Sequence, residues 1–196
     1  MAKLYFRYGT VGSAKTLNLL AVAHNYRAQG KEVVLIRPEL DKRFGKANIK
    51  SRAGLEMNAD LLITPETDLL GHNFEGIHCI LVDEAQFLTN KNIEQLRLVA
   101  YEKGIPVICY GLRTDFQTHL FEGSKRLLEL ADSVEEIKST CYKCNKKSVF
   151  NLRHLDGVAV DEGPTILLGA EDTYHPACYG CYTREIASAK LAAASI

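Results

Sequence analysis

Residues 3–29 read KLYFRYGTVGSAKTLNLLAVAHNYRAQ, and this stretch decides the fold class. Its first part, KLYFRY at residues 3–8, has the apolar and aromatic character of a short β-strand. A glycine-containing turn follows at 9–14, and Lys15 to Gln29 has the apolar spacing of a helix. A strand that leads through a tight turn into a helix is the first unit of an α/β sheet.

Three further segments have the continuous apolar character of strands that are buried on both faces. They are EVVLIR at 32–37, IHCILVD at 77–83 and IPVICYG at 105–111. Such runs fit a parallel sheet that helices cover on both sides. A helix is expected from Asn92 to Lys103, between the last two strands. The alternation predicts an α/β fold with a mostly parallel sheet and helices on both faces. By contrast, residues 38–58 are rich in Lys and Arg without a sustained period, which predicts a long surface loop.

Composition excludes several classes of protein. Hydrophobic residues make up 46% of the 196 residues and charged residues 24%, as in a globular domain, which excludes disorder as the main state. No apolar run approaches the ~18–20 residues that a membrane span needs. Lys+Arg and Asp+Glu are both 24, so no general nucleic-acid or membrane-surface binder is indicated. The N-terminus MAKLYFRYGT lacks the features of a signal peptide, so we expect a cytoplasmic protein.

The turn after the first strand has the pattern of a phosphate-binding loop. Residues 9–16, GTVGSAKT, follow the Walker A motif G-x-x-x-x-G-K-[ST] except that Ala14 stands at the second glycine. Backbone N–H groups at the helix start would cradle phosphates, Lys15 would reach the β- and γ-phosphates, and Thr16 would hold Mg²⁺. If the backbone at Ala14 has a positive φ, alanine costs on the order of 1 kcal/mol there. The motif predicts a P-loop, RecA-like sheet. Alone it does not exclude an ordinary strand–helix turn.

A second acidic motif follows the strand 77–83. The strand ends in Asp83 and Glu84, within ILVDEAQF. A carboxylate at the carboxyl end of a parallel strand, opposite a phosphate loop, is a Walker B feature. Asp83 would hold Mg²⁺ directly or through water, and Glu84 would act as the general base.

Four of the six cysteines form two C-x-x-C pairs that are typical of a structural zinc site. Each pair places two thiolates on one side of a tight turn, and four thiolates suit a closed tetrahedral Zn²⁺ site. The predicted ligands are Cys141, Cys144, Cys178 and Cys181. Redox dithiols or free thiols are the alternatives. We expect a nucleotide-binding α/β domain at 1–140, a zinc lobe at 141–186, and a C-terminal tail at 187–196.

Together these motifs resemble the cellular-type (type II) thymidine kinases over about residues 3–185. The phosphate loop is followed by VDEAQF, by YGLRTDFQTHLF at 110–121 and by ILLGAEDTYHPAC before the last cysteine pair. The resemblance implies transfer of the ATP γ-phosphoryl group to the 5′-hydroxyl of thymidine or deoxyuridine, in pyrimidine salvage. It implies Mg²⁺ with ATP, structural zinc and a homotetramer, with no nucleic acid or membrane as a partner.

The resemblance also implies roles for individual residues. Glu84 matches the catalytic base that takes the 5′-OH proton. The implied ATP and Mg²⁺ site consists of Gly9, Thr10, Val11, Gly12, Ser13, Ala14, Lys15, Thr16, Arg43, Asp83 and Gln86. The implied nucleoside site consists of Leu112, Phe116, Phe121, Tyr174 and a loop over the base, Thr165, Ile166, Leu167, Leu168 and Gly169.

The phosphate loop departs from the family pattern, which is close to G-P-M-F-S-G-K-S. Thr10, Val11 and Gly12 replace P-M-F, and Ala14 replaces glycine. Two other functions therefore stay open. One is a single-domain P-loop ATPase that acts on nucleic acid, since DEAQ also resembles a helicase box, although length and zero net charge argue against it. The other is a zinc-ribbon binding module with a decayed nucleotide site.

Overall fold

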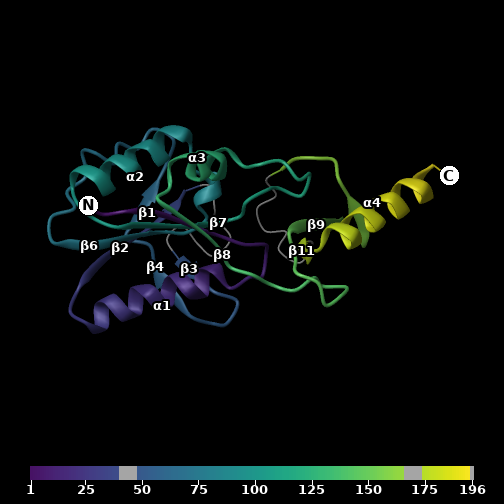
Figure 1. Ribbon diagram of the computed structural model, residues 1–196, viewed down its shortest axis with the longest axis horizontal. Coiled ribbons are helices and arrows are strands. Elements are labelled where there is room, and N and C mark those ends of the chain that lie inside the picture. The colour runs from purple at the N-terminus through teal and green to yellow at the C-terminus, as the bar shows by residue number, and fades with distance from the viewer. Residues whose placement is uncertain (40–47, 166–173, 195–196) are drawn as a thin grey trace.

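The computed structural model describes residues 1–39, 48–165 and 174–194, which form two parts of unequal size (Figure 1). The larger part is a six-stranded sheet in which every neighbouring pair is parallel, in the order β5-β2-β6-β7-β1-β8. Its strands are β1 (Leu4–Tyr8), β2 (Glu32–Pro38), β5 (Leu61–Ile63), β6 (Ile77–Val82), β7 (Val107–Gly111) and β8 (Ser133–Glu136). The predicted α/β class is confirmed.

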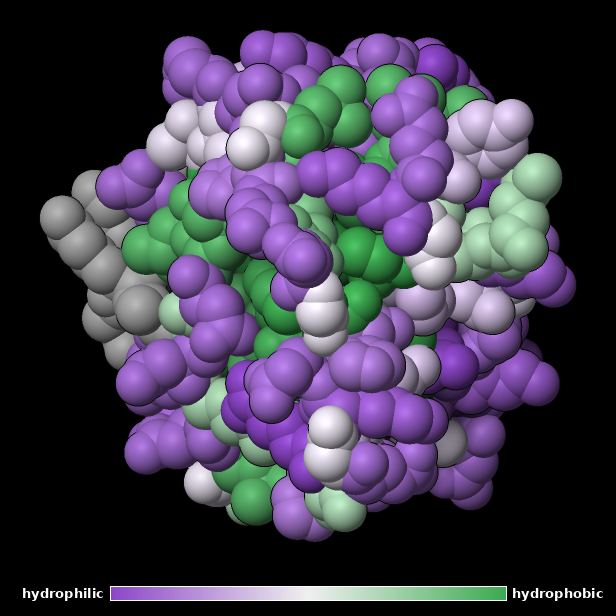
Figure 2. Space-filling view, turned by 90° about the vertical axis from the view of Figure 1, so that its left-hand side faces the viewer, coloured by the Kyte–Doolittle hydropathy of each residue, from purple (hydrophilic) through white to green (hydrophobic). Residues whose placement is uncertain are grey.

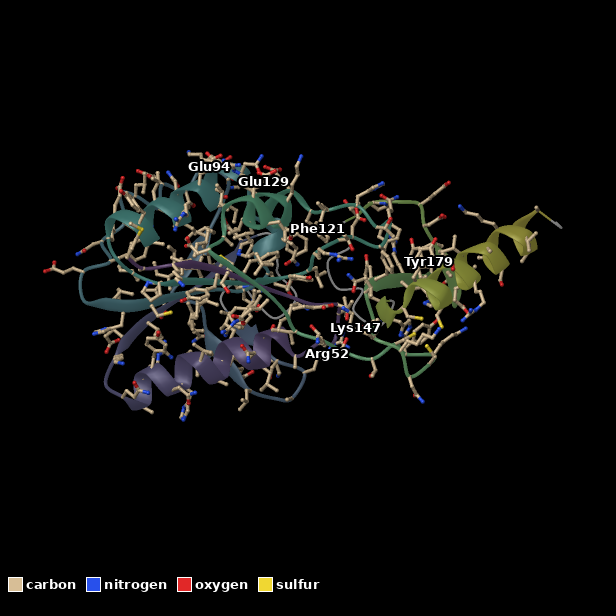
Figure 3. All side chains as sticks on the ribbon, in the orientation of Figure 1. Arg52, Glu94, Phe121, Glu129, Lys147 and Tyr179 are labelled. Carbon is tan, nitrogen blue, oxygen red and sulfur yellow. The ribbon has the colours of Figure 1, made fainter. Side chains whose placement is uncertain are left out.

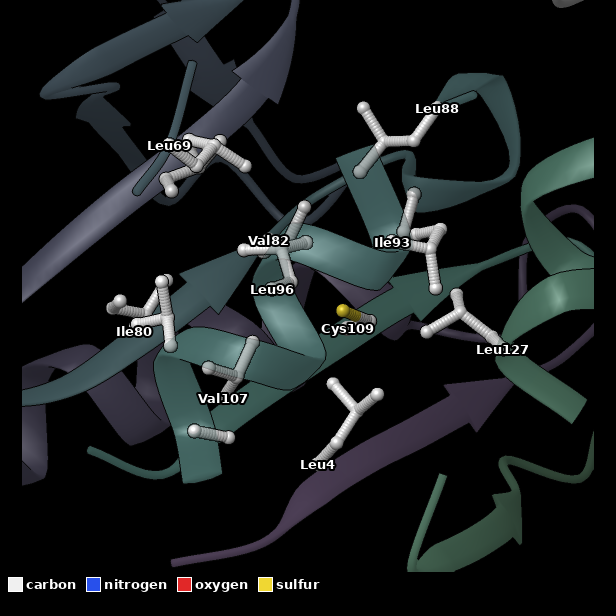
Figure 4. Close-up of a cluster of buried hydrophobic side chains, with 14 of the residues drawn as sticks. Leu4, Leu69, Ile80, Val82, Leu88, Ile93, Leu96, Val107, Cys109 and Leu127 are labelled. Carbon is white, nitrogen blue, oxygen red and sulfur yellow. The ribbon is translucent and has the colours of Figure 1, made fainter. Parts of the chain in front are cut away.

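Helices cover both faces of this sheet. Helix α1 (Lys15–Ala28) lies on one face, and α2 (Asn90–Glu102) and α3 (Glu122–Leu130) lie on the other (Figure 1). Helix α2 begins two residues before the predicted start because Thr89 and Asn92 form a capping box. Apolar residues of β1, β6 and β7 pack against α2 and α3 in one large buried cluster (Figure 4). A second cluster lies between the sheet and α1.

Part of the predicted loop at 38–58 is a hairpin, which corrects that prediction. Strands β3 (Asn48–Lys50) and β4 (Glu56–Asn58) pair antiparallel. Ile49 is fully buried in the cluster under α1, and its pairing partner Met57 packs against the same cluster. Strands of three residues are too short to show a period of two, so the sequence pattern could not reveal them.

The smaller part is a lobe built on a three-stranded antiparallel sheet. Its strands, in the order β10-β9-β11, are β9 (Phe150–Leu155), β10 (Val158–Val160) and β11 (Tyr174–Ala177). Helix α4 (Tyr179–Ala193) packs on this sheet through Tyr182 and Ile186 and ends near the C-terminus (Figure 1). The residues predicted as tail therefore continue a helix up to Ala193.

The carboxyl ends of the parallel strands face this lobe (Figure 1). The opposite end of the α/β domain shows hydrophobic residues near its centre within a mostly hydrophilic surface (Figure 2). A 3-10 turn, η1 (Ala85–Phe87), follows β6 at the end that faces the lobe. Within the described ranges, no helix has both the length and the apolar character to cross a membrane.

Candidate functional site

The phosphate loop joins β1 to α1 and has the tight geometry that its glycines permit. A Cβ on Gly9 would lie 2.3 Å from Ser13 Oγ and 2.6 Å from the carbonyl oxygen of Ile137, so a side chain does not fit there. Gly12 has φ 77°. Ala14, at the N-cap of α1, also lies in the left-handed region, with φ 62° and ψ 27°. The missing glycine therefore falls where alanine carries a cost of about 1 kcal/mol.

Three predicted phosphate and Mg²⁺ residues meet at this loop. Lys15 Nζ donates to the carbonyl oxygen of Thr10 at 2.8 Å, so the ammonium group lies against its own loop. Thr16 Oγ1 donates to both carboxylate oxygens of Asp83, each at 3.3 Å. A hydroxyl and a carboxylate in contact beside a phosphate loop form a donor set that suits Mg²⁺.

Asp83 is buried, and its charge is strongly affected by its surroundings. Burial and then repulsion by Glu84 raise the pKa of the carboxyl to about 7, although the cations Arg37 and Lys15 oppose this rise. Asp83 N donates to the carbonyl oxygen of Ile36 at 2.9 Å, which places Arg37 beside it on the neighbouring strand. Sequence analysis missed Arg37. The sequence carried a sign of its role, because this charged residue ends a continuous apolar run. A strand of that kind is buried, so its last side chain was to be expected beside the acidic end of the neighbouring strand.

Glu84 and Gln86 lie directly after β6 and contact each other. Glu84 has φ 51°, an uncommon conformation for a residue with a side chain. Gln86 Oε1 accepts from the backbone N–H of Leu112 at 3.1 Å, so its Nε2 is left to donate to Glu84 Oε2 at 2.5 Å. A Cβ at Gly111 would lie 2.7 Å from Gln86 Oε1, so glycine makes room for this bridge. The structure thus places Gln86, predicted in the ATP and Mg²⁺ site, between Glu84 and the predicted nucleoside residue Leu112.

The aromatic residues predicted for the nucleoside site take part in two separate ring contacts. Phe116 is buried, and its ring meets Tyr174 edge to face at 6.4 Å between centroids. The Arg153 guanidinium lies 4.9 Å from the centre of the Phe116 ring, and Tyr182 Oη donates to the Phe116 carbonyl at 2.7 Å. These contacts tie Phe116 to the lobe, although Arg153 and Tyr182 carry no sequence motif that would have revealed them.

Phe121 belongs to a different contact. It precedes α3 (Figure 3), and its ring meets Phe87 edge to face at 5.6 Å between centroids. Thr165 is exposed. The remaining predicted site residues lie outside the described part of the chain: Arg43, Ile166, Leu167, Leu168 and Gly169.

The four predicted zinc ligands come together in the lobe. The sulfur atoms of Cys141, Cys144, Cys178 and Cys181 all lie within 4.8 Å of one another. The Sγ atom of Cys144 is 3.6 Å from that of Cys178 and 3.8 Å from that of Cys181. A tetrahedral ion with Zn–S bonds of about 2.3 Å requires sulfur atoms about 3.8 Å apart. The donor set and its spacing therefore fit structural zinc.

The backbone around these thiols also favours a bound cation. Burial raises the pKa of the Cys141 thiol, but N–H groups of Cys178, Lys143 and Cys144 outweigh it and lower the pKa to about 6. The pKa of Cys178 is lowered, chiefly by the N–H of Cys181. Burial and the neighbouring thiols raise the pKa of Cys181 to about 12. Thiols that share one site are expected to shift one another's pKa in this way. A divalent cation would relieve the repulsion among their thiolates.

Comparison with known proteins agrees with this geometry. Residues 2–182 match a family model described as thymidine kinase. The chain is 44% identical over 181 residues to a thymidine kinase of Streptococcus pyogenes serotype M28, covering 91% of this chain and 95% of the relative. It is 45% identical to a thymidine kinase of Streptococcus gordonii (91% and 94%) and 41% identical to one of Lactobacillus acidophilus (91% and 94%).

Proposed function

The chain belongs to the thymidine kinase family, and we propose that it transfers the ATP γ-phosphoryl group to the 5′-hydroxyl of thymidine or deoxyuridine with Glu84 as general base. One observation supports the assignment of residues: the phosphate loop contacts Asp83, and the carboxylate of Glu84 is adjacent to it. Phosphoryl transfer depends mainly on positioning and on neutralisation of charge, and this site offers both.

The phosphate side of the site is proposed to consist of residues 9–16 and Asp83. Lys15 leaves the Thr10 carbonyl oxygen for the β- and γ-phosphates when ATP binds. Thr16 and Asp83, which are in contact, would hold Mg²⁺, and the ion would supply neutralisation of charge on the transferring group. Arg37 favours the ionised form of Asp83, which is the form that binds a metal.

The acceptor side depends on Glu84. Its carboxylate must come within about 2.6–3.2 Å of the 5′-hydroxyl to take the proton. Gln86 is proposed as a positioning residue, since it holds one carboxylate oxygen of Glu84 and the backbone of Leu112 together. Leu112, Phe116, Phe121 and Tyr174 are proposed to surround the pyrimidine.

The lobe has a supporting role in this proposal. The four cysteines would hold a structural zinc ion. The predicted loop over the base, residues 165–169, stays a prediction, since all of it after Thr165 lies outside the described part of the chain. The division at residues 140 and 186, the homotetramer and the absence of a nucleic-acid partner stay predictions. A reducing compartment such as the cytoplasm is proposed because four metal-binding thiols must stay reduced.

The general base can be tested with one substitution and a matched control. Glu84→Gln keeps the shape of the side chain but removes its basicity, so kcat should fall by about 10²–10⁴-fold. Glu102→Gln, at the exposed end of α2, should keep the wild-type rate. The measurement is formation of dTMP from Mg-ATP and thymidine, with Mg-ATP affinity determined separately. A near-normal rate in Glu84→Gln would remove Glu84 as the base.

A further inference from the structure

The first half of the phosphate loop is bonded to the lobe through a group of hydroxyls. Thr10 Oγ1 lies 2.8 Å from Ser139 Oγ and 2.9 Å from Ser148 Oγ, and the two serine oxygens are 2.6 Å apart. Thr10 and Ser148 are both buried. Each hydroxyl can donate once and accept from the others, and Ser148 Oγ also lies 3.0 Å from the carbonyl oxygen of Ser139.

A fourth residue adds a second connection to the same loop. Asn151 is 3% exposed and lies on β9 of the lobe. Its Oδ1 accepts from the backbone N–H of Val11 at 2.8 Å, and its Nδ2 donates to the carbonyl oxygen of Thr114 at 3.1 Å. One side chain therefore joins the phosphate loop, the segment after β7 and the lobe.

The two serines flank the first pair of zinc ligands. Ser139 and Ser148 are held together by a hydrogen bond from Ser148 N to Ser139 O at 2.8 Å, and Cys141 and Cys144 lie between them in the chain. Cys141 N donates to the carbonyl oxygen of Lys146 at 2.8 Å, which closes the ligand-bearing loop. Lys147, at the junction of the two parts, pairs with Glu136 at 2.7 Å (Figure 3). The loop conformation that brings Cys141 and Cys144 into the metal site is thus the same one that places both serine hydroxyls against Thr10.

We propose that Thr10, Ser139, Ser148 and Asn151 form a clasp that positions the phosphate loop, so that metal binding in the lobe and Mg-ATP binding at the loop favour each other. All four are positioning residues, because none is asked to touch the reacting atoms. The inference rests on the proposed nucleotide site. It adds to that site a connection that leads from Thr10 of the phosphate loop through Ser139, Ser148 and Asn151, which lie outside both ligand sets.

The size of the effect follows from the bonds involved. A buried hydrogen bond between neutral groups makes a net difference of about threefold to tenfold in an equilibrium. Coupling between two binding sites is reciprocal, so Mg-ATP must tighten zinc binding by the same factor by which zinc tightens Mg-ATP binding. Zinc affinity with and without Mg-ATP therefore reports on the clasp without any catalytic turnover.

The test compares wild-type protein with Thr10→Val, which keeps the shape of the side chain but removes the hydroxyl. Zinc retention is measured against a competing colorimetric chelator, with and without saturating Mg-ATP, and Mg-ATP binding is titrated directly for each protein. In the wild type, Mg-ATP should improve zinc retention by about threefold to tenfold. In Thr10→Val the ratio should fall clearly below the wild-type value, because only the connection through Asn151 remains, and Thr10→Ser should restore it. Thr183→Val removes a lobe hydroxyl that, among the described residues, bonds only within α4, and it should behave as wild type.

The outcomes separate the two proposals. A Thr10→Val protein that keeps the wild-type ratio would overturn the clasp, as would a wild-type ratio of one in protein that binds Mg-ATP and forms dTMP. Wild-type protein that binds no Mg-ATP would overturn the proposed function itself. If Thr10→Val does not fold, Ser148→Ala makes the same test from the lobe side of the triangle.

Discussion

The α/β domain and the lobe are stabilised in different ways. The domain has large apolar clusters on both faces of its sheet, which include Leu96 and Val82 on one face and Leu20 and Leu81 on the other. Among the described residues, the buried cluster of the lobe consists only of Leu152, Ala159, Ala177, Tyr182 and Ile186. Beside it lie the four cysteines.

This difference explains why the lobe carries a metal site. A small cluster buries too little surface to offset the conformational entropy of its chain, so small folds commonly need a metal or disulfides. The α/β domain has no such need. The predicted reacting groups Asp83 and Glu84 follow β6 of the larger domain, whereas the cluster of four cysteines lies in the lobe.

Removal of zinc should produce the largest contrast between the two parts. Structural zinc contributes about 10 kcal/mol or more of folding free energy to small domains. Chelation should therefore make the amides of β9, β10 and α4 exchange rapidly, whereas those of β6 and β7 keep their protection. Hydrogen exchange with mass spectrometry measures both at once, and added zinc should restore the lobe. Lobe amides that stay protected in verified zinc-free protein would contradict this account.

A pair of matched core substitutions should sharpen the comparison. Leu96 and Leu152 are both fully buried, one in each part. Leucine-to-alanine changes at such sites cost about 2–5 kcal/mol. Leu96→Ala should lower the free energy of unfolding of the α/β domain by this amount and its urea midpoint accordingly. Leu152→Ala should leave that midpoint near the wild-type value and loosen the lobe. Equal shifts of one shared transition would show that the two parts unfold as a single unit.

The raised pKa of Asp83 predicts a pH dependence that is confined to the α/β domain. With a pKa of about 7 the folded protein binds a proton that the unfolded chain, with an ordinary carboxyl, has lost. Stability without ligand should therefore fall as pH rises from about 4 through 7. Magnesium needs the ionised carboxylate, so Mg-ATP affinity should rise about tenfold between pH 6 and 8.

Calorimetric titration with Mg-ATP at several pH values measures this effect. Asp83→Asn removes the titrating carboxyl and controls for the titration of ATP itself. The variant should lose most of the rise in affinity. If it shows the full wild-type rise, another group controls Mg-ATP binding.

The smallest predicted effect concerns the loop itself. Ala14→Gly relieves a left-handed alanine and should raise stability by about 1 kcal/mol, or about 2–4 °C in Tm. Mg-ATP affinity should be equal or better. Scanning calorimetry with and without Mg-ATP measures both quantities. A less stable variant would mean that the methyl group of Ala14 makes contacts that outweigh its strain.

The sequence predicted what depends on residue type at fixed spacing. Motif spacing identified three features: the strand that ends before Asp83, the phosphate loop and the four cysteines. The strain at Ala14 was expected because this is the one position that does not match the Walker A motif. The hairpin β3–β4 was missed because three residues show no period.

Other features were out of reach because they depend on tertiary contacts. Asn151 and the pair Ser139 and Ser148 gain their importance from neighbours that are distant in the chain, and such residue types are common on any surface. Helix α3 was missed although its apolar face packs on the sheet through Leu127, because only nine residues carry the pattern. The sequence thus identified candidate reacting groups, and the structure added the residues that contact them.

The most direct test of the account is Mg-ATP-dependent phosphorylation of a panel of nucleosides by the folded, zinc-containing protein. The panel contains thymidine, deoxyuridine, deoxycytidine, deoxyadenosine, deoxyguanosine and uridine. The account predicts 5′-monophosphate product from thymidine and deoxyuridine alone, which would also show that Ala14 is compatible with catalysis. No product from any nucleoside would contradict it and would leave the chain as a binding protein on a kinase fold.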